Sequence, residues 1–190
     1  MIYLIGGCSR SGKTTLARRM LRERGVPCFS SDHLARTFGR LGLAGVSVDE
    51  DDRATAKKLE LVLLNLVAAI GYDSEDYLLE GVHLGPAQIR HAIDGYELPF
   101  SACLLGYPDA DPEEKLAALE AARSGQGDWL KGFDRATQLR FLEAQREISR
   151  EQRSAAERLD LPFFDGSADI AQAVDEAFTA LTSGAAVRGA

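Results

Sequence analysis

Short apolar runs alternate along the chain with longer stretches in which apolar residues recur every three or four positions. Runs of the first kind predict buried strands, and stretches of the second kind predict amphipathic helices. The five predicted strands are Ile2–Gly6, Val26–Ser30, Tyr77–Glu80, Pro99–Leu105 and Leu161–Asp165. Because strands and helices alternate, the pattern predicts an α/β fold of three layers, in which helices cover both faces of a parallel sheet.

The predicted helices carry their own start and stop signals. The first, Lys13–Arg24, ends before Gly25, a residue type that commonly caps helices in the left-handed conformation. The segment Ser47–Glu50 has the pattern of a capping box and predicts the start of a long helix that closes at Gly71. Further helices are expected from Pro86, from Pro112 behind Asp111 as N-cap, over Asp134–Leu159, and over Asp169–Leu181.

Length and charge narrow the class of protein. The chain has 190 residues, with 22 Lys and Arg against 29 Asp and Glu, so its formal charge is −7. We expect one domain over residues 1–182, a flexible tail over residues 183–190, and no nucleic-acid partner for a chain this acidic. No apolar run reaches the ~18 residues of a membrane span, and the N-terminus lacks a signal-peptide pattern, so a cytoplasmic location is expected. Three cysteines without metal-ligand spacing predict neither a disulfide framework nor a zinc site.

The segment Gly7–Thr14 reads Gly-Cys-Ser-Arg-Ser-Gly-Lys-Thr and matches the phosphate-loop pattern G-x-x-x-x-G-K-[ST] in full. It follows an apolar strand and opens a helix, which is the context that this motif requires. We expect Lys13, facing solvent, to reach the β- and γ-phosphates of a nucleoside triphosphate, and Thr14 to ligate Mg²⁺. The residues expected to bind ATP are Gly7, Ser9, Arg10, Ser11, Gly12, Lys13, Thr14 and Thr15.

Several classes of phosphate-loop protein lack support in this sequence. A GTPase reads its base with an Asn-Lys-x-Asp motif, but Asn65 is the only asparagine and lies in an apolar helix. Motor and transporter ATPases usually end the next apolar strand in Asp or Asp-Glu, whereas Tyr77–Glu80 ends in a lone Glu. The remaining readings are an enzyme that transfers phosphate to a small acceptor and, from a different class, a regulatory protein in which slow hydrolysis switches conformation.

Two acidic residues end predicted strands and therefore belong to the ligand-binding edge of the sheet. Asp32 would orient or deprotonate an acceptor hydroxyl, unless it only caps the helix that follows. Glu80 would hold a metal-bound water or the substrate. Arg36 and Arg90 are candidates to clamp an anionic acceptor, and His83 is a candidate to contact it, although each is equally well explained as an ordinary helix or surface residue.

The phosphate loop, the Ser-Ser-Asp-x-x-x-Arg element from Ser30 to Arg36 and the acid-ended third strand resemble small kinases of the nucleoside-monophosphate-kinase-like group. That group includes shikimate, gluconate, chloramphenicol and polynucleotide kinases, and Leu79–Pro86 also resembles a segment of 2-phosphoglycerate kinase. The resemblance implies a sheet of order 2-3-1-4-5, Asp32 as the base, and adenine beside the loop that contains Gly166. It implies an ATP- and Mg²⁺-dependent kinase with a small-molecule acceptor. A polynucleotide 5′-hydroxyl kinase is the alternative within the group, and the acidic charge disfavours it.

A glycine-rich segment around Trp129 precedes the most strongly charged helix and predicts a lid over residues 124–140. A kinase needs a cation to stabilise the charge that develops on the transferred phosphoryl group. Arg123, Lys131, Arg135 and Arg140 border the glycine-rich segment, and Arg123 and Arg135 are the leading candidates because each adjoins it.

Overall fold

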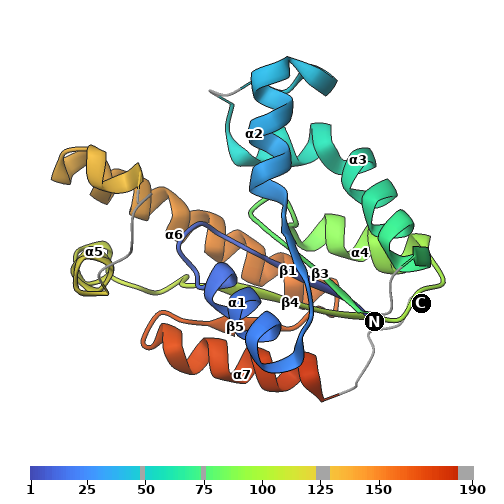
Figure 1. The fold of residues 1–190 in the computed structure, drawn as a ribbon. Helices are drawn as coiled ribbons and strands as arrows, with labels where there is room; N and C mark the ends of the chain where they lie inside the picture. The colour runs from blue at the N-terminus through green and yellow to red at the C-terminus, as the bar shows by residue number, and fades with distance from the viewer. Residues whose placement is uncertain (48–49, 74–75, 123–128, 184–190) are drawn as a thin grey trace.

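A computed structural model describes residues 1–47, 50–73, 76–122 and 129–183 (Figure 1). Within these ranges the strands are β1 Ile2–Gly7, β2 Cys28–Ser30, β3 Tyr77–Glu80, β4 Phe100–Gly106 and β5 Phe163–Asp165. They form one sheet of order β2-β3-β1-β4-β5, and every neighbouring pair is parallel. The predicted topology is therefore confirmed, with the phosphate loop following the central strand.

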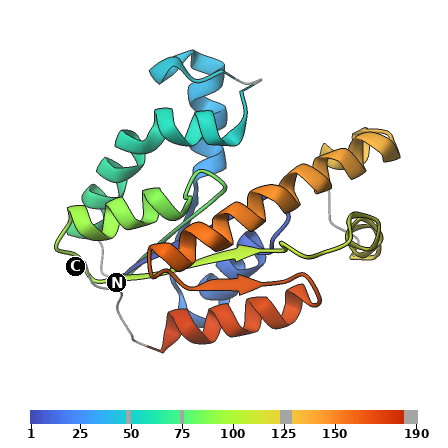
Figure 2. The same ribbon diagram turned by 180° about the vertical axis from the view of Figure 1, so that it is seen from behind.

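Helices lie on both faces of the sheet (Figures 1 and 2). The helices are α1 Lys13–Arg24, α2 Ser31–Leu41, α3 Asp52–Asp73, α4 Pro86–Gly95, α5 Pro112–Ala121, α6 Arg135–Arg158 and α7 Ile170–Thr182. One face is covered by α1 and α7, and the other by α3, α4 and α6. Two short 3₁₀ turns, η1 Leu43–Gly45 and η2 Trp129–Gly132, precede α3 and α6. The first part of α6 projects beyond the sheet beside α5, and α2 rises on the other side of the phosphate loop.

The core is two apolar layers separated by the sheet. Alternate residues of β1 point to opposite faces, so Leu4 packs in the layer under α3, α4 and α6, whereas Ile5 packs in the layer under α1 and α7. Both side chains are fully buried. Because both faces are covered, the central strands are apolar at nearly every position, which is why they are recognisable as continuous apolar runs.

Most of the predicted helix ends are confirmed. Gly25 caps α1 in the left-handed conformation, and the Asp111, Asp134 and Asp169 side chains accept hydrogen bonds from the first N–H groups of α5, α6 and α7. Single-residue caps of this kind depend on local geometry alone, so they can be located from the sequence.

The predicted start and end of α3 are wrong. The Asp51 side chain accepts hydrogen bonds from the N–H groups of Arg53 and Ala54, so the helix begins at Asp52 and not behind Ser47. Residues 48 and 49 of the expected capping box lie outside the described residues. Gly71 lies within the helix, where it admits Leu98, since a Cβ at this position would come within 2.3 Å of the Leu98 side chain.

Two strands are shorter than predicted because prolines precede them. The Pro27 carbonyl accepts from Leu78 N–H and the Pro162 carbonyl accepts from Leu104 N–H, but neither proline has an N–H to donate. The ladders therefore begin only at Cys28 and Phe163. No helix of the described ranges is long and apolar enough to cross a membrane. Residues 184–190 of the predicted tail lie outside those ranges.

Candidate functional site

The phosphate loop is held open by glycines between β1 and α1. Gly7 and Gly12 have φ values of +130° and +97°, and a Cβ on Gly7 would lie 2.0 Å from the Leu105 carbonyl oxygen. Gly12 is the N-cap of α1 and supplies no side-chain hydrogen bond, so the first N–H groups of the helix have no capping side chain. Ser11 Oγ is buried and has no hydrogen-bond partner in the described residues. Unclaimed donors at a helix N-terminus fit a phosphate group.

Lys13 lies inside this loop, whereas the sequence analysis expected it to face solvent. The residue is only 5% exposed, and its Nζ donates a hydrogen bond to the Cys8 carbonyl oxygen at 2.6 Å. Thr14 Oγ1 lies 3.5 Å from Glu80 Oε1 at the end of β3. Burial raises the pKa of Glu80, and the Lys13 charge opposes that shift.

Thr14 and Glu80 suit a bound Mg²⁺, because hydroxyl and carboxylate oxygens are the hard ligands that this ion takes. The described residues contain no group of three or more His, Cys, Asp or Glu side chains that would hold a metal by themselves. Mg²⁺ usually keeps several waters and binds through one or two protein ligands together with substrate phosphates. The two oxygen donors therefore fit a metal that arrives with a nucleotide.

Asp32 lies in the first turn of α2 but does not cap it. The cap is Ser30, whose Oγ accepts from the Asp32 N–H at 3.4 Å. Gly81, with a φ of +150°, lets the turn after β3 approach this helix, since a Cβ there would come within 1.8 Å of Ser31 Oγ and 3.2 Å of Asp32 Oδ1. Asp32 Oδ1 is buried and has no hydrogen-bond partner in the described part of the chain. The Asp32 side chain as a whole is 37% exposed, so its carboxylate is accessible to a ligand and is placed to take a proton.

His83 lies between Asp32 and a second carboxylate, Asp52, which the sequence analysis did not identify. Its Nδ1 is 3.1 Å from Ser31 Oγ and 3.5 Å from Asp32 Oδ1, and its Nε2 is 3.9 Å from Asp52 Oδ1. Burial lowers the pKa of His83 below its ordinary value, although both carboxylates oppose the shift. Burial also raises the pKa of Asp52. Burial therefore favours the neutral imidazole over the imidazolium.

A cavity of about 370 Å³ extends from these acids along α2. Asp32, Arg36 and Arg40 follow one another at intervals of four residues, so they share the helix face that lines it. In the described part of the chain neither arginine has an ion-pair partner. The cavity thus offers two cations to an anionic ligand whose other end lies near the carboxylates.

Trp129 and Phe141 line the opposite side of this cavity. The Trp129 ring lies 5.0 Å from the Phe141 ring and 6.0 Å from the Phe133 ring, centroid to centroid, edge to face in both pairs. The Arg10 guanidinium is 5.6 Å from the Trp129 ring centroid, which joins the phosphate loop to η2. Within the described part of the predicted lid, Trp129 lines the cavity and residues 130–140 do not, whereas residues 124–128 and Arg123 lie outside the described residues.

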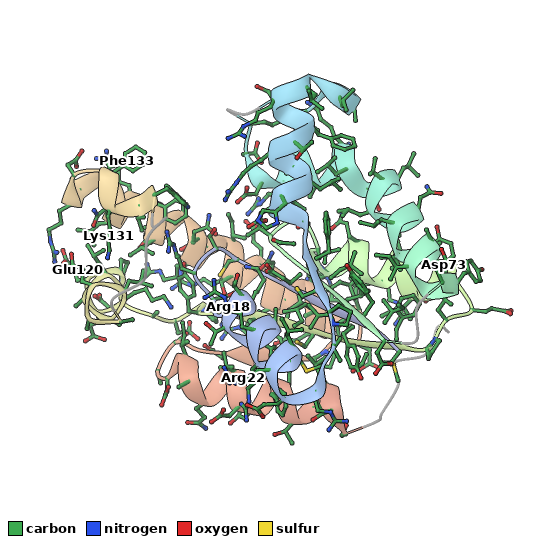
Figure 3. All side chains as sticks on the ribbon, viewed as in Figure 1. Arg18, Arg22, Asp73, Glu120, Lys131 and Phe133 are labelled. Carbon is green, nitrogen blue, oxygen red and sulfur yellow. The ribbon has the colours of Figure 1, made fainter. Side chains whose placement is uncertain are left out.

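Arg135 and Arg90 are not brought to this cavity. Arg135 is exposed and forms ion pairs with two carboxylates of α5, Glu113 and, at 3.9 Å, Glu120. These pairs lie at the projecting end of the molecule, where Figure 3 labels Glu120. Arg90 forms an ion pair with Asp94 one turn along its own helix. Neither arginine is among the residues that line the cavity.

The remaining predicted residues lie around the phosphate loop. Thr15 is exposed in the first turn of α1. Gly166 follows β5, and its N–H donates to the Gly106 carbonyl oxygen at 2.8 Å. Ile170 lies near both Gly166 and Gly12, since a Cβ on either glycine would contact its side chain. The loop after β5 is therefore a neighbour of the phosphate loop.

Sequence analysis missed Asp52, Arg40 and Gln145. Arg40 had a signal, because it repeats the four-residue spacing from Asp32 through Arg36. Gln145 of α6 accepts the Ser9 N–H at 2.8 Å, a contact between residues 136 positions apart. No local pattern marks such a residue, and Asp52 looked like an ordinary acid in the first turn of a helix.

No protein-family model matches the sequence, and no curated protein matches it with significant similarity. Solved structures do match. An uncharacterised protein from Eubacterium ventriosum ATCC 27560 has a TM-score of 0.55 at 11% identity, over 96% of this chain and 99% of that one. A shikimate kinase from Acinetobacter baumannii in complex with shikimate has a TM-score of 0.53 at 16% identity, over 93% of this chain and 87% of that one. A gluconokinase from Sinorhizobium meliloti 1021 has a TM-score of 0.51 at 16% identity, over 95% of this chain and 90% of that one. Identities this low show the fold alone, and the chain has the αβα phosphate-loop fold found in small kinases.

Proposed function

We propose that the protein is an ATP- and Mg²⁺-dependent kinase that transfers the γ-phosphate of ATP to a hydroxyl or phosphate group of a small anionic molecule. The observation that carries the proposal is the Asp32 carboxylate, which is 37% exposed and lines a cavity next to the phosphate loop, and whose Oδ1 has no hydrogen-bond partner among the described residues. Hydrolysis alone also uses a base, but the two arginines of this cavity, which have no ion-pair partner among the described residues, favour an anionic acceptor over water. The base favours a hydroxyl as the group that receives the phosphate.

On the nucleotide side, the N–H groups at the start of α1 and the Lys13 ammonium bind the phosphates. Thr14 and Glu80 hold the Mg²⁺. Bound ATP·Mg²⁺ supplies the phosphoryl group and neutralises part of its charge. The Arg10 side chain, in the phosphate loop and against Trp129, contributes further positive charge in place of Arg135, which is paired on α5.

On the acceptor side, Arg36 and Arg40 bind the anionic group and place the hydroxyl beside Asp32. Asp32 accepts the hydroxyl proton as the oxygen attacks. The His83 ring lies against Asp32, with Nδ1 3.1 Å from Ser31 Oγ and 3.5 Å from Asp32 Oδ1, and limits the movement of this carboxylate. Trp129 and Phe141 exclude water from the opposite wall when the lid closes.

The test is a screen of small hydroxy acids and sugar acids for acceptor-dependent ADP release, run with the wild type and with Asp32→Asn. Loss of the base should lower turnover by ~10²- to 10⁴-fold while ATP binding persists. The matched control is Asp73→Asn, at the far end of α3 (Figure 3). If ATP is consumed without any acceptor, and at the same rate in Asp32→Asn, the protein is a regulatory NTPase and not a kinase. Labelling of a 5′-hydroxyl oligonucleotide in preference to every small acid would show a polynucleotide kinase.

A further inference from the structure

A second cavity, of about 440 Å³, lies behind the phosphate loop. Its walls come mainly from α3, α4 and α6, which lie on the same face of the sheet (Figure 2). Many of the residues that line it are apolar: Ala56, Val82, Pro86, Ile148, Ala155 and Leu159. A space with these walls favours an apolar occupant, because apolar surface gains free energy when it leaves water.

This second cavity adjoins the first one. Asp52 and Val82 line both cavities, and Gly7 and Cys8 of the phosphate loop line the second. A molecule whose reactive hydroxyl lies beside Asp32 therefore has a second space within reach, past Asp52 and Val82.

The charged groups of the second cavity are compensated only in part. Arg53 of α3 pairs with Glu151 of α6 at 2.5 Å across the cavity wall, whereas Arg158 is exposed at the end of α6 and donates to the neutral Ser154 Oγ at 3.3 Å. Gln152 Oε1 is buried and has no hydrogen-bond partner among the described residues. Because most of the walls are apolar, the second cavity suits a mainly apolar group that carries at most one hydrogen-bond donor.

We propose that the phosphate acceptor is amphipathic. Its hydroxyl and anionic group occupy the first cavity, and an apolar substituent extends past Asp52 and Val82 into the second. The inference rests on the proposed function for the role of the head group, whereas the apolar substituent is argued from the second cavity alone. Small, wholly polar hydroxy acids would fill only the first cavity and should be poor ligands.

The test measures the binding of 2-hydroxybutanoate, 2-hydroxyhexanoate and 2-hydroxyoctanoate by calorimetry, in the presence of a non-hydrolysable ATP analogue. Affinity should rise along the series, by up to about fourfold for each methylene that enters the second cavity. Ala155→Phe and Ala87→Phe place a ring in this cavity from α6 and from α4, and each should remove the rise without weakening the shortest acid. Ala144→Phe, the same change at an exposed position of α6, should leave the rise in affinity along the series unchanged.

Equal affinity along the series, or no binding of the octanoate, would overturn the inference, as would a rise that survives in both cavity variants. The same samples are assayed for ADP, which separates the two proposals. Binding that depends on chain length without phosphorylation of any member would contradict the kinase and leave the second cavity as an apolar binding site. Phosphorylation without dependence on chain length would support the kinase and refute the amphipathic acceptor.

Discussion

The nucleotide side and the acceptor side of the site are built from different parts of the chain. The phosphate loop is one continuous segment whose backbone forms the site, with Ser11 and Lys13 buried beside it. The acceptor cavity is built mainly from α2, α3, η2, α6 and the turn after β3, with Ser9 as the contribution of the phosphate loop, and its two arginines are exposed. Substitutions on the acceptor side should therefore change which molecule is phosphorylated, whereas the nucleotide side depends on a backbone that side-chain changes hardly alter.

The largest expected effect comes from Lys13, the side chain that contacts the phosphates on the nucleotide side. Lys13→Ala removes the charge from the β- and γ-phosphates and should lower turnover by about 10³-fold or more. Because Lys13 is buried and bonded to the Cys8 carbonyl, circular dichroism must confirm that the variant folds. Lys57→Ala, at an exposed position of α3, is the control. Turnover and ATP affinity near wild type in a folded Lys13→Ala protein would rule out the phosphate-loop assignment.

Glu80→Gln should separate catalysis from stability. Turnover should fall by about 10- to 100-fold, the usual cost of losing a group that orients a metal ligand. The acceptor KM should stay unchanged, because Glu80 is not among the residues that line the acceptor cavity. Titration with Mg²⁺ provides the readout, since the variant should need more of the ion for half-maximal activity. An unaltered Mg²⁺ dependence would remove Glu80 from the metal site.

The same substitution should stabilise the protein at neutral pH. Burial raises the pKa of Glu80 in the folded state above its value in the unfolded state. The folded protein therefore binds this proton more tightly, and the protonated carboxyl contributes to the free energy of unfolding. That contribution is complete below the unfolded pKa of about 4.3 and is lost as the pH rises through the folded pKa. Thermal unfolding should therefore show that Glu80→Gln gains more over wild type at pH 8 than at pH 4.5. Glu97→Gln, exposed before β4, should show no such trend.

Loss of Arg36 or Arg40 should affect the acceptor and not ATP. Each Ala substitution should raise the acceptor KM by about tenfold or more, because a hydrogen bond to a charged group contributes ~1.5–3 kcal/mol. The KM for ATP should not change. Arg22→Ala, on the far side of α1 (Figure 3), controls for the loss of a positive charge. Equal increases in both KM values would mean that these arginines act on the nucleotide.

The smallest effect is expected at Trp129, where the two sides meet. Its fluorescence should change when ATP and the acceptor are both bound, and change less with ATP alone, because a lid closes once both substrates are in place. Arg10→Ala removes the cation from the ring and should weaken this response, with a loss of about two- to fivefold in kcat/KM. If the Trp129 fluorescence does not change with any ligand that supports turnover, the lid lies elsewhere.

The predictable features of this molecule are the local ones. The bounds of α1 and β3 and the Asp111 cap depend on neighbouring residues, and all three were predicted from the sequence. The start of α3 was not, because Ser47 and Asp51 both suit a cap and the choice depends on tertiary packing. Gly71 looked like a stop signal, but the close approach of Leu98 explains it.

The candidate site divides in the same way. The phosphate loop is recognisable as a motif, whereas the group formed by Asp32, His83 and Asp52 joins residues up to 51 positions apart. Arg135 was proposed because it adjoins a glycine-rich segment, but α5 offers it two carboxylates. The second cavity has no sequence signal, because its walls come from three helices that meet only in the fold.

The most direct test of the central claim follows the γ-phosphate itself by ³¹P NMR, with ATP, Mg²⁺ and the best acceptor from the screen. The account predicts that the γ-phosphate signal of ATP is replaced by a phosphate-ester signal on the acceptor, and that Asp32→Asn slows this exchange without weakening ATP binding. If inorganic phosphate accumulates in its place at the same rate in both proteins, the protein hydrolyses ATP and Asp32 is not a base.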